Sequence, residues 1–276
     1  MIVGIPKEVK NNENRVSMIP FAIEDISKCN HQCIVQSQAG IGSGFTDEEY
    51  GDVGAMIVDS PQEIFHKSDI IIKVKEPQTE EIHMIKEEQI VFTYFHFAAD
   101  ETLTKAFLNS GATAIAYETI MLSDTSLPLL IPMSEVAGRM SVQEGAKYLE
   151  KFHGGRGKLL GGVPGVEPAR VTILGGGIVG TNAAHIAAGL GATVNILDVN
   201  LNRLRYLDEI MPKNVRTIYS NQYNIQELLP RTDLLIGAVL IPGAKAPKLV
   251  SKEMLGKMQE GSVVVDVAID QGGCIE

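Results

Sequence analysis

Three glycines spaced as G-x-G-x-x-G stand between a run of residues typical of a buried strand and a run that favours a helix. The strand pattern is Val171–Leu174, the glycine motif extends from Gly175 to Gly180, and the helical pattern starts at Thr181. In this setting Gly175 permits a tight turn, Gly177 lets backbone N–H groups approach a pyrophosphate, and Gly180 lets the helix pack closely on the strand. The motif therefore predicts a turn that binds a dinucleotide.

A carboxylate follows the next predicted strand at the distance that such a turn requires. Ala192–Leu197 is apolar and β-branched, and Asp198 comes directly after it, about 20 residues beyond Gly175. A carboxylate here accepts hydrogen bonds from the hydroxyls of the adenosine ribose, and its charge repels the 2′-phosphate of NADP. NAD is therefore the predicted cofactor. Arg203 lies shortly after this acid, where it could weaken the exclusion of NADP or simply lie exposed on a helix.

Two later apolar runs predict further strands of the same sheet. They are Leu234–Val239 and Val263–Val267. Ligands of open α/β sheets bind beyond the carboxyl ends of the strands. We therefore expect the nicotinamide end of the cofactor to lie beside the residues that end these runs, which are Val239, Leu240, Val267, Ala268, Ile269 and Asp270. Asp270 is the one acid among them.

Short β-branched runs also alternate with helical patterns through the first half of the chain. The predicted strands are Ile2–Ile5, Cys33–Val35, Ala55–Val58, Ile70–Val74, Ile90–Phe95 and Ala112–Tyr117, and the helical patterns between them include Pro20–Cys29, Pro61–His66 and Glu101–Asn109. Such alternation is typical of parallel βαβ units. We therefore predict an α/β protein of two Rossmann-like domains, whose parallel sheets flank a central cleft.

A break in the pattern predicts where the two domains meet. Pro128 and Pro132 flank a short apolar piece, and a helical pattern then opens at Met133-Ser134-Glu135, where a serine can cap the first turn. We place the boundary near Pro132. The prediction is a substrate (catalytic) domain over residues 1–132 and an NAD-binding domain over residues 133–276.

Composition and charge exclude several classes of function. The 276 residues carry a net charge of −10 without a dense Lys/Arg block, which argues against nucleic acid as a partner and against a polybasic membrane anchor. No apolar run approaches the about 20 residues that span a bilayer, and the N-terminus does not resemble a signal peptide, so we expect a cytoplasmic protein. Cys29, Cys33 and Cys274 are an odd and sparse set that suits reduced thiols, and we predict no metal site.

Motifs spread over nearly the whole chain add to this picture. Besides the glycine turn they are Gly4–Glu8, Asn14–Val16, Ile72–Pro77, Tyr94–His96, Pro132–Gly138, Gly161–Val166 and Val239–Pro247. Together they resemble the family of bacterial alanine dehydrogenases, and several are shared with the related α subunit of NAD(P) transhydrogenase. His96 and the stretch Ile241–Pro247 resemble alanine dehydrogenase more than transhydrogenase.

The resemblance implies an NAD-dependent enzyme that interconverts L-alanine with pyruvate and ammonia. By its match to the family motifs, Arg15 and Lys75 bind the substrate, His96 is the acid/base, and Asp270 is a second catalytic group. The resemblance also implies a homo-oligomer, a hexamer. Further cofactor contacts that it implies are Ser134, Ile178, Val179, Arg203 and Ser220.

The residue types suit this chemistry independently. Arg15 offers a planar fork that binds a carboxylate through two hydrogen bonds, and Lys75, at the end of an apolar strand, could hold the carboxylate or polarise a 2-oxo group. After the α-hydrogen leaves as hydride, water adds to the iminium and ammonia departs, which needs a group that exchanges protons near neutral pH, as the imidazole of His96 does. Asp270, from the cofactor domain, could orient the water or ammonia as the domains close on the substrate. Each of the four also has a plainer structural interpretation, as a core histidine, solvated lysine, surface arginine or turn-forming aspartate.

Members of the family usually continue beyond the point that corresponds to Glu276, so we expect a chain that lacks the C-terminal part of the family. Two alternatives to alanine dehydrogenase activity therefore stay open. The chain could bind NAD with little or no turnover, or it could transfer hydride between nucleotides, as a transhydrogenase α subunit does.

Overall fold

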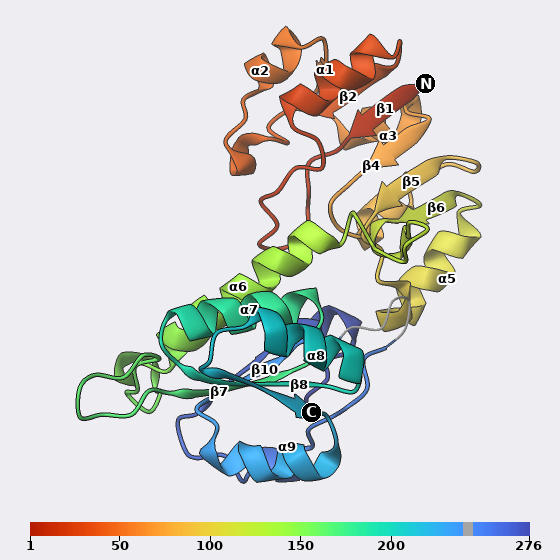
Figure 1. The fold of residues 1–276 in the computed structure, drawn as a ribbon. Coiled ribbons are helices and arrows are strands. Elements are labelled where there is room, and N and C mark those ends of the chain that lie inside the picture. Colours follow the sequence, from red (N-terminus) through yellow and green to blue (C-terminus); the bar gives the residue numbers. More distant parts are fainter. Residues whose placement is uncertain (240–244) are drawn as a thin grey trace. The chain divides into compact units, whose positions relative to one another are not determined.

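Runs of Ile, Val and Leu form the strands of two parallel β-sheets (Figure 1). The computed structural model describes residues 1–239 and 245–276, with the side chains of Asp270 and Gln271 left out. The chain divides into two compact units, Met1–Met121 and Leu122–Glu276, and each contains one of the sheets. The predicted α/β class with two parallel, Rossmann-like sheets is confirmed.

The sheet of the first unit has the strand order β3-β2-β1-β4-β5-β6, with every neighbouring pair parallel. Its strands are β1 (Ile2–Ile5), β2 (Gln32–Gln36), β3 (Met56–Val58), β4 (Ile70–Ile72), β5 (Ile90–Thr93) and β6 (Thr113–Ala116). From β1 the chain adds strands on one side of the sheet, and it then returns to β4 on the other side. The direction of winding therefore switches between β1 and β4, which is where open α/β sheets bind ligands.

Helices cover both faces of this sheet (Figure 1). They are α1 (Pro20–Lys28), α2 (Asp47–Asp52), α3 (Pro61–Lys67), α4 (Thr79–Ile82) and α5 (Glu101–Asn109). Ile23 of α1 and Tyr50 of α2 are buried in one core cluster, whereas Phe65 of α3 and Phe107 of α5 are buried in the other. The unit therefore has the three layers expected of a doubly wound fold.

The sheet of the second unit has the order β11-β10-β7-β8-β9 and is also parallel. Its strands are β7 (Arg170–Leu174), β8 (Thr193–Asp198), β9 (Val215–Tyr219), β10 (Leu234–Gly237) and β11 (Val263–Asp266). Four of them coincide with predicted strands, and β9 is an addition that the sequence analysis did not assign. The winding switches between β7 and β10, which places the ends of these two strands side by side.

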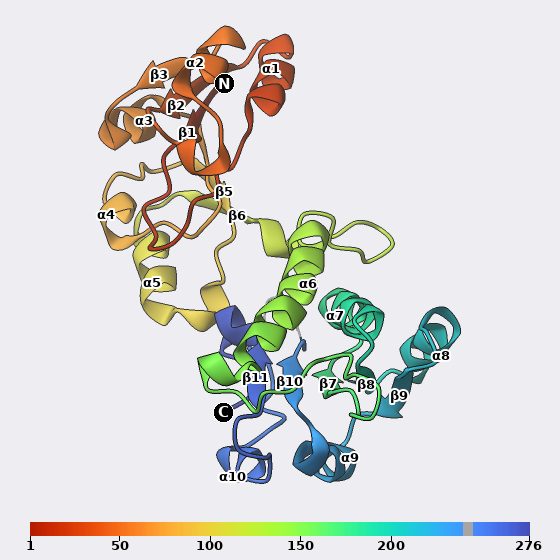
Figure 2. The same cartoon turned by 90° about the vertical axis from the view of Figure 1, so that its left-hand side faces the viewer.

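The helices of the second unit are α6 (Ile131–Tyr148), α7 (Ile178–Gly189), α8 (Leu201–Ile210), α9 (Gln222–Leu228) and α10 (Lys252–Leu255). Figure 2 shows α6, α7 and α8 on one side of the strands and α9 and α10 on the other. Helices α6 and α7 approach closely because Gly138 has no side chain. A Cβ atom at Gly138 would lie 2.3 Å from the carbonyl oxygen of Val179.

The two units divide at Met121 and Leu122, ahead of the boundary predicted near Pro132. The N–H groups of Leu130 and Ile131 both donate to the carbonyl oxygen of Leu127, which joins the segment before the helix to the start of α6. Within the described ranges, no helix combines the length and the apolar composition that crossing a membrane requires.

Two strands of the first unit end earlier than predicted. The run Ile70–Val74 stays in the ladder only to Ile72, and the run Ile90–Phe95 only to Thr93. In both places a buried carboxylate takes the backbone N–H: Glu8 accepts from Val74 at 2.6 Å, and Glu118 accepts from Phe95 at 3.2 Å. Two backbone bonds still join the runs beyond these ends, from Lys73 to Phe92 and from Tyr94 to Val74. Acidic side chains therefore add to the backbone bonds at the strand ends that carry the predicted substrate site.

Candidate functional site

A cavity of about 560 Å³ in the second unit lies beside the glycine turn. Its lining comes from the ends of β7, β8, β9 and β10 and from the first turns of α6 and α7. The ends of β7 and β10 flank the point at which the direction of winding switches. The lining includes the following residues that were predicted to contact the cofactor: Ser134, Gly175, Gly177, Ile178, Val179, Asp198, Ser220 and Val239.

The glycine turn has the local geometry that its motif requires. Gly175 has φ +104°, a conformation that other residues rarely adopt, and a Cβ atom on Gly180 would lie 1.8 Å from the carbonyl oxygen of Gly175. At Gly177, by contrast, an added Cβ would meet no atom within 4 Å. Two glycines therefore permit close backbone packing, and the third leaves open space in front of the N-terminus of α7, where a pyrophosphate is stabilised.

Asp198 ends β8 with its carboxylate at the wall of this cavity. One oxygen accepts a hydrogen bond from the N–H of Gly176 and the other from the N–H of Asn200, both at 2.8 Å. A carboxylate has about four acceptor positions, so these bonds orient the group and leave it able to accept ribose hydroxyls. The geometry thus suits the role predicted from its spacing.

Other predicted cofactor residues lie elsewhere in the unit. Val267, Ala268 and Ile269 form a short 3-10 helix after β11 and do not line the cavity. Arg203, on the first turn of α8, also lies outside the lining and contacts the glycine turn instead. Leu240 lies outside the described residues, as does the side chain of Asp270, so their predicted roles stay predictions.

The segment before α6 and the start of that helix supply one wall of the cavity that was not predicted from the sequence. The lining residues there are Thr125, Ser126, Leu127, Leu130 and Ile131. Gly138, inside the helical pattern, is the sequence signal for this arrangement, because an isolated glycine within a helix usually has a packing reason. Its contact with Val179 brings the start of α6 against the glycine turn.

In the first unit, the three residues predicted to handle the substrate follow the ends of three adjacent strands. Arg15 follows β1, Lys75 follows β4, and His96 follows β5. The ammonium of Lys75 acts electrostatically on Glu13, whose carboxylate binds Arg15, and Arg15 acts in turn on Tyr94. The ring of Tyr94 stacks on that of His96, with centroids 6.1 Å apart. The fold therefore gathers all three at one end of the sheet.

Glu13 holds the guanidinium of Arg15 in place. Its two carboxylate oxygens accept from Nε at 2.8 Å and from an Nη nitrogen at 2.6 Å. Burial alone would raise the pKa of Glu13, but the hydrogen bonds from Arg15 outweigh it and lower that pKa, while the same bonds raise the pKa of Arg15. Arg15 thus stays charged and oriented, as a residue that binds a carboxylate must be.

His96 has an unusual backbone and side chain. Its φ of 53° and ψ of 37° lie in the left-handed region, which costs a non-glycine residue about 1–3 kcal/mol. The buried carboxylate of Glu118 offsets this cost by accepting the N–H of His96 at 2.7 Å. Both ring nitrogens are buried, and neither has a hydrogen-bond partner among the described residues. A buried polar group without a partner needs an explanation, and a substrate would supply one.

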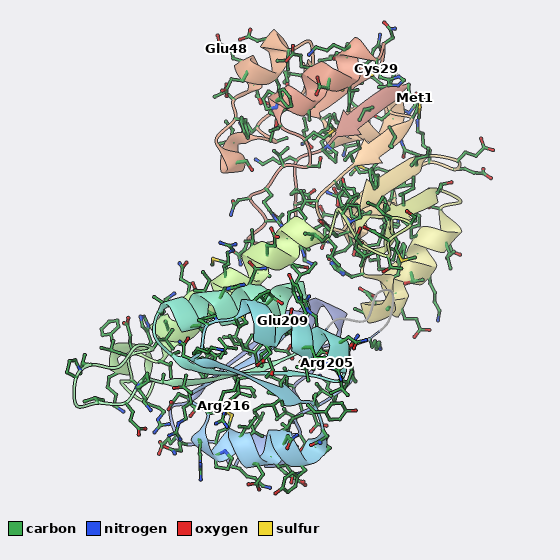
Figure 3. The ribbon with its side chains drawn as sticks, in the orientation of Figure 1. Met1, Cys29, Glu48, Arg205, Glu209 and Arg216 are labelled. Atoms are coloured by element: carbon green, nitrogen blue, oxygen red, sulfur yellow. The ribbon has the colours of Figure 1, made fainter. Side chains whose placement is uncertain are left out.

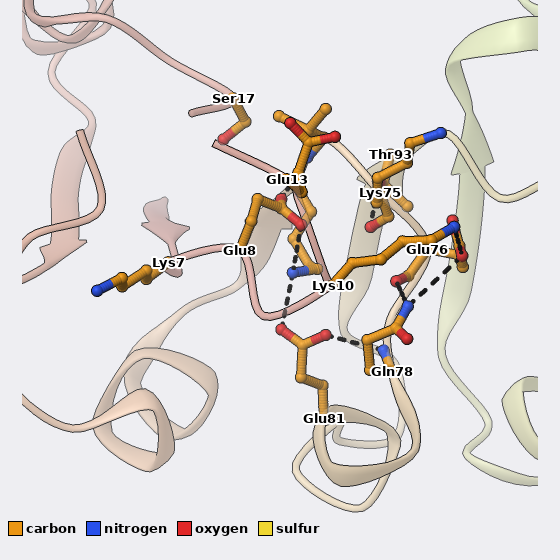
Figure 4. Close-up of polar contacts among 12 residues, drawn as sticks. Lys7, Glu8, Lys10, Glu13, Ser17, Lys75, Glu76, Gln78, Glu81 and Thr93 are labelled. Carbon is orange, nitrogen blue, oxygen red and sulfur yellow. Dashed lines mark hydrogen bonds and ion pairs between the residues drawn. The ribbon is translucent and has the colours of Figure 1, made fainter. Parts of the chain in front are cut away.

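A buried ionic cluster supports the segment that carries Lys75. Lys73 is fully buried, and its ammonium lies 3.1 Å from Glu8 and 2.7 Å from Glu81. Glu8 accepts the backbone N–H of Val74, and Glu81 accepts that of Gln78 (Figure 4). Burial raises the pKa of Glu8 above its ordinary value, and the positive charge of Lys73 only partly opposes this rise. The backbone on either side of Lys75 is therefore fixed by buried charges.

The three thiols are separate from both of these regions. Cys29 is exposed on the first unit (Figure 3), whereas Cys33 and Cys274 are buried in the two cores. Within residues 1–239 and 245–276, no cluster of three or more His, Cys, Asp or Glu side chains could hold a metal ion.

Comparisons with known proteins agree with the two-unit organisation. The family model for the alanine dehydrogenase/PNT N-terminal domain matches residues 4–137, and that for the C-terminal domain matches residues 141–276. An alanine dehydrogenase of Methanococcus maripaludis is 59% identical over the whole chain, which spans 74% of that relative.

Solved structures extend this result. A structure described as L-alanine dehydrogenase has a TM-score of 0.90 and 50% identity, with the match covering 100% of this chain and 76% of that one. A transhydrogenase from Sinorhizobium meliloti has a TM-score of 0.82 and 28% identity, covering 100% and 81% of the two chains. The family resemblance noted in the sequence is thus confirmed. This chain belongs to the alanine dehydrogenase/PNT family.

Proposed function

We propose that this chain catalyses the NAD-dependent oxidative deamination of L-alanine to pyruvate and ammonia, and the reverse reductive amination. Two relatives named alanine dehydrogenase are 59% and 55% identical to it over the whole chain. The observation that supports the proposal most directly is His96. Its ring nitrogens are buried without a partner among the described residues, and its ring stacks on Tyr94, on which the charge of Arg15 acts.

The second unit suits a nicotinamide dinucleotide. The space at Gly177, where a Cβ would meet nothing, fits a pyrophosphate, and the carboxylate of Asp198 would bind the adenosine ribose. Ser134, Ser220 and Val239 would border the rest of the cofactor from the cavity wall. When bound, the nicotinamide ring accepts the α-hydrogen of the substrate as a hydride ion.

The first unit supplies the groups that act on the amino acid. Arg15 would bind its carboxylate, because Glu13 keeps the guanidinium charged and oriented. Lys75 would stabilise the carboxylate or the developing 2-oxo oxygen. His96 would take a proton from the water that attacks the iminium and return one to the departing ammonia, a role that an imidazole with both nitrogens available can fill. Asp270 is proposed as the second catalytic group on its match to the family motif.

A turnover assay tests this function. We expect formation of NADH that depends on L-alanine at alkaline pH, and oxidation of NADH that depends on pyruvate and ammonia together. Binding of NAD without amino-acid-dependent turnover would contradict the proposal and favour a chain that only binds the dinucleotide. Hydride exchange between two nucleotides alone would instead favour the transhydrogenase alternative.

The preference for NAD depends on Asp198. Replacing Asp198 with alanine removes two charge-assisted bonds to the ribose, and we expect the Kd for NAD to rise by about 10- to 100-fold. The affinity for NADP should rise at the same time, because the carboxylate no longer repels the 2′-phosphate. Fluorescence titration with NADH and NADPH measures both.

Asp198→Asn is the matched control, since it keeps the size of the side chain and one acceptor oxygen for the Gly176 N–H, while it removes the charge and replaces the second acceptor with an amide donor. It should gain NADPH affinity while losing less NADH affinity than the alanine variant. If neither variant changes the ratio of the two affinities, the cofactor is not discriminated at this residue.

The predicted hexamer and the cytoplasmic location rest on the family resemblance and on composition. Light scattering of the purified chain tests the oligomeric state, for which a hexamer is the expected result.

A further inference from the structure

One residue of the glycine turn, Gly176, is held through both its backbone N–H and its carbonyl oxygen. The N–H of Gly176 donates to Asp198 at 2.8 Å, and its carbonyl oxygen accepts from Nε of Arg203 at 2.6 Å. A Cβ on Gly176 would lie 2.9 Å from Leu207 and 3.1 Å from Asp198, so this residue is also packed tightly. Gly176 is therefore bound by an acidic residue at the end of β8 and by a basic residue on the first turn of α8.

A threonine on α7 extends this network. Thr181 accepts from an Nη nitrogen of Arg203 at 2.7 Å, and its hydroxyl oxygen lies 2.7 Å from the carbonyl oxygen of Gly177 and 3.2 Å from that of Gly176. The guanidinium of Arg203 also lies over the ring of Tyr206, 5.0 Å from its centroid. The side chain of Arg203 is thus held against the turn by its hydrogen bonds and by the ring.

The direction of a carbonyl determines the direction of the next N–H. In a planar trans peptide, the C=O of one residue and the N–H of the following residue point in opposite directions. Holding the carbonyl of Gly176 therefore sets the N–H of Gly177. The carbonyl of Gly177, which sets the N–H of Ile178, accepts the backbone N–H of Thr181 at 2.9 Å as well as its hydroxyl. Gly177 and Ile178 both line the cavity, and no described residue accepts a hydrogen bond from the N–H of Gly177.

We propose that Arg203 and Thr181 are positioning residues for the dinucleotide pyrophosphate. They bind the carbonyl oxygens of Gly176 and Gly177 on the outer side of the turn, and this presents the N–H groups of Gly177 and Ile178 to the phosphate oxygens. The same bonds keep the negative ends of these carbonyl dipoles away from the anion, which they would otherwise repel. Arg203 then acts through the turn, in keeping with its position outside the cavity lining.

The proposal rests on the cofactor part of the proposed function, and it does not depend on the amino-acid substrate. Its test is therefore equilibrium binding, which stays informative even if L-alanine turnover is absent. ADP-ribose, which contains the pyrophosphate, and adenosine, which lacks it, are the two probes. Titration calorimetry measures ADP-ribose directly, and competition against ADP-ribose measures adenosine.

Thr181→Val keeps the shape of the side chain and removes the hydroxyl. We expect it to weaken ADP-ribose binding by about three- to ten-fold, because it removes the bond that the hydroxyl donates to Gly177 and the bond that it accepts from Arg203. Arg203→Met should weaken ADP-ribose binding by about ten-fold or more, because the bonds of its guanidinium are charge-assisted. Adenosine binding should change by less than about twofold in both. Thr181→Ser, which restores the hydroxyl, should return ADP-ribose binding to the wild-type value.

Two further variants separate the network from a general effect on α8. Arg205→Met alters an exposed arginine on the same helix (Figure 3) and should leave ADP-ribose binding unchanged. The double variant Thr181→Val/Arg203→Met should bind little more weakly than Arg203→Met alone, because the two residues act on the same turn. Equal weakening of adenosine and ADP-ribose, or full additivity of the two substitutions, would overturn the proposal.

Discussion

Replacing His96 with alanine is expected to lower kcat for L-alanine oxidation by about 10²- to 10⁴-fold, the usual contribution of a general acid/base. The imidazole has both nitrogens buried without a partner among the described residues, so its removal takes away a proton-exchanging group without breaking any hydrogen bond that its ring makes in the described structure. NAD affinity should stay close to the wild-type value, because the predicted cofactor cavity is lined by residues of the second unit. Steady-state kinetics and NADH titration measure the two effects.

His83→Ala is the control for this prediction. His83 is an exposed residue that caps the C-terminus of α4, and its loss should leave kcat unchanged. A fall in NAD affinity as large as the fall in kcat would contradict the separation of the two sites. Wild-type kcat in His96→Ala would remove His96 from the mechanism altogether.

Replacing Lys73 with methionine is expected to destabilise the fold by about 3–5 kcal/mol at neutral pH, because removing one partner of a buried ionic group leaves uncompensated charge. Lys73 is fully buried between Glu8 and Glu81, whose side chains are 3% and 4% exposed. Without the ammonium, two carboxylates would share a site with little access to water. Urea denaturation followed by circular dichroism measures the loss.

The pH dependence of this loss gives a second test. Burial already raises the pKa of Glu8 above its ordinary value of 4.5, and Lys73 is the main charge that opposes the rise. Removing Lys73 therefore raises this pKa further, so that the folded state binds more protons than the unfolded state. The free energy of unfolding of the variant should then increase as the pH falls from about 8 toward 5, whereas a carboxyl with a lowered pKa would give the opposite slope.

Lys10→Met provides the matched control, because Lys10 also pairs with a glutamate of this region, at 2.5 Å from Glu76. Its side chain is 37% exposed, so the pair is screened by water and its loss should cost at most about 1 kcal/mol. The triple variant Lys73→Met/Glu8→Gln/Glu81→Gln should recover part of the stability by removing the unpaired charges. Equal stabilities of Lys73→Met and Lys10→Met at pH 8 would show that Lys73 is not buried as described.

Local patterns were sufficient to predict much of the architecture. The run Val171–Leu174, the glycines from Gly175 to Gly180 and the acid Asp198 predicted strand, turn, helix and strand in the order that β7, α7 and β8 confirm. Each of these signals is carried by residues that are neighbours in sequence. Backbone preferences and burial periodicity act over such short distances, and a single chain is enough to reveal them.

Strand β9 shows the limit of such patterns. Val215–Tyr219 has one buried residue, Val215, and contains Arg216, so its apolar signal is weaker than that of the central strands. It lies at the edge of the sheet, paired only with β8 among the described strands. An edge strand needs fewer apolar residues because less of it is buried, and its place follows from pairing with a strand elsewhere in the chain.

In the candidate substrate site, too, the sequence indicated some features and only the tertiary structure decided the others. The sequence by itself indicated Arg15, Lys75 and His96 through residue type, position after a strand and family motif. Only the tertiary structure decided what holds them: Glu118 lies 22 residues from His96, and Glu8 lies 66 residues from Val74. Those carboxylates bind the backbone beside the site, just after the ends of β4 and β5. A buried acid has no local pattern, because its partner is chosen by the packing of distant segments and not by its neighbours in the chain.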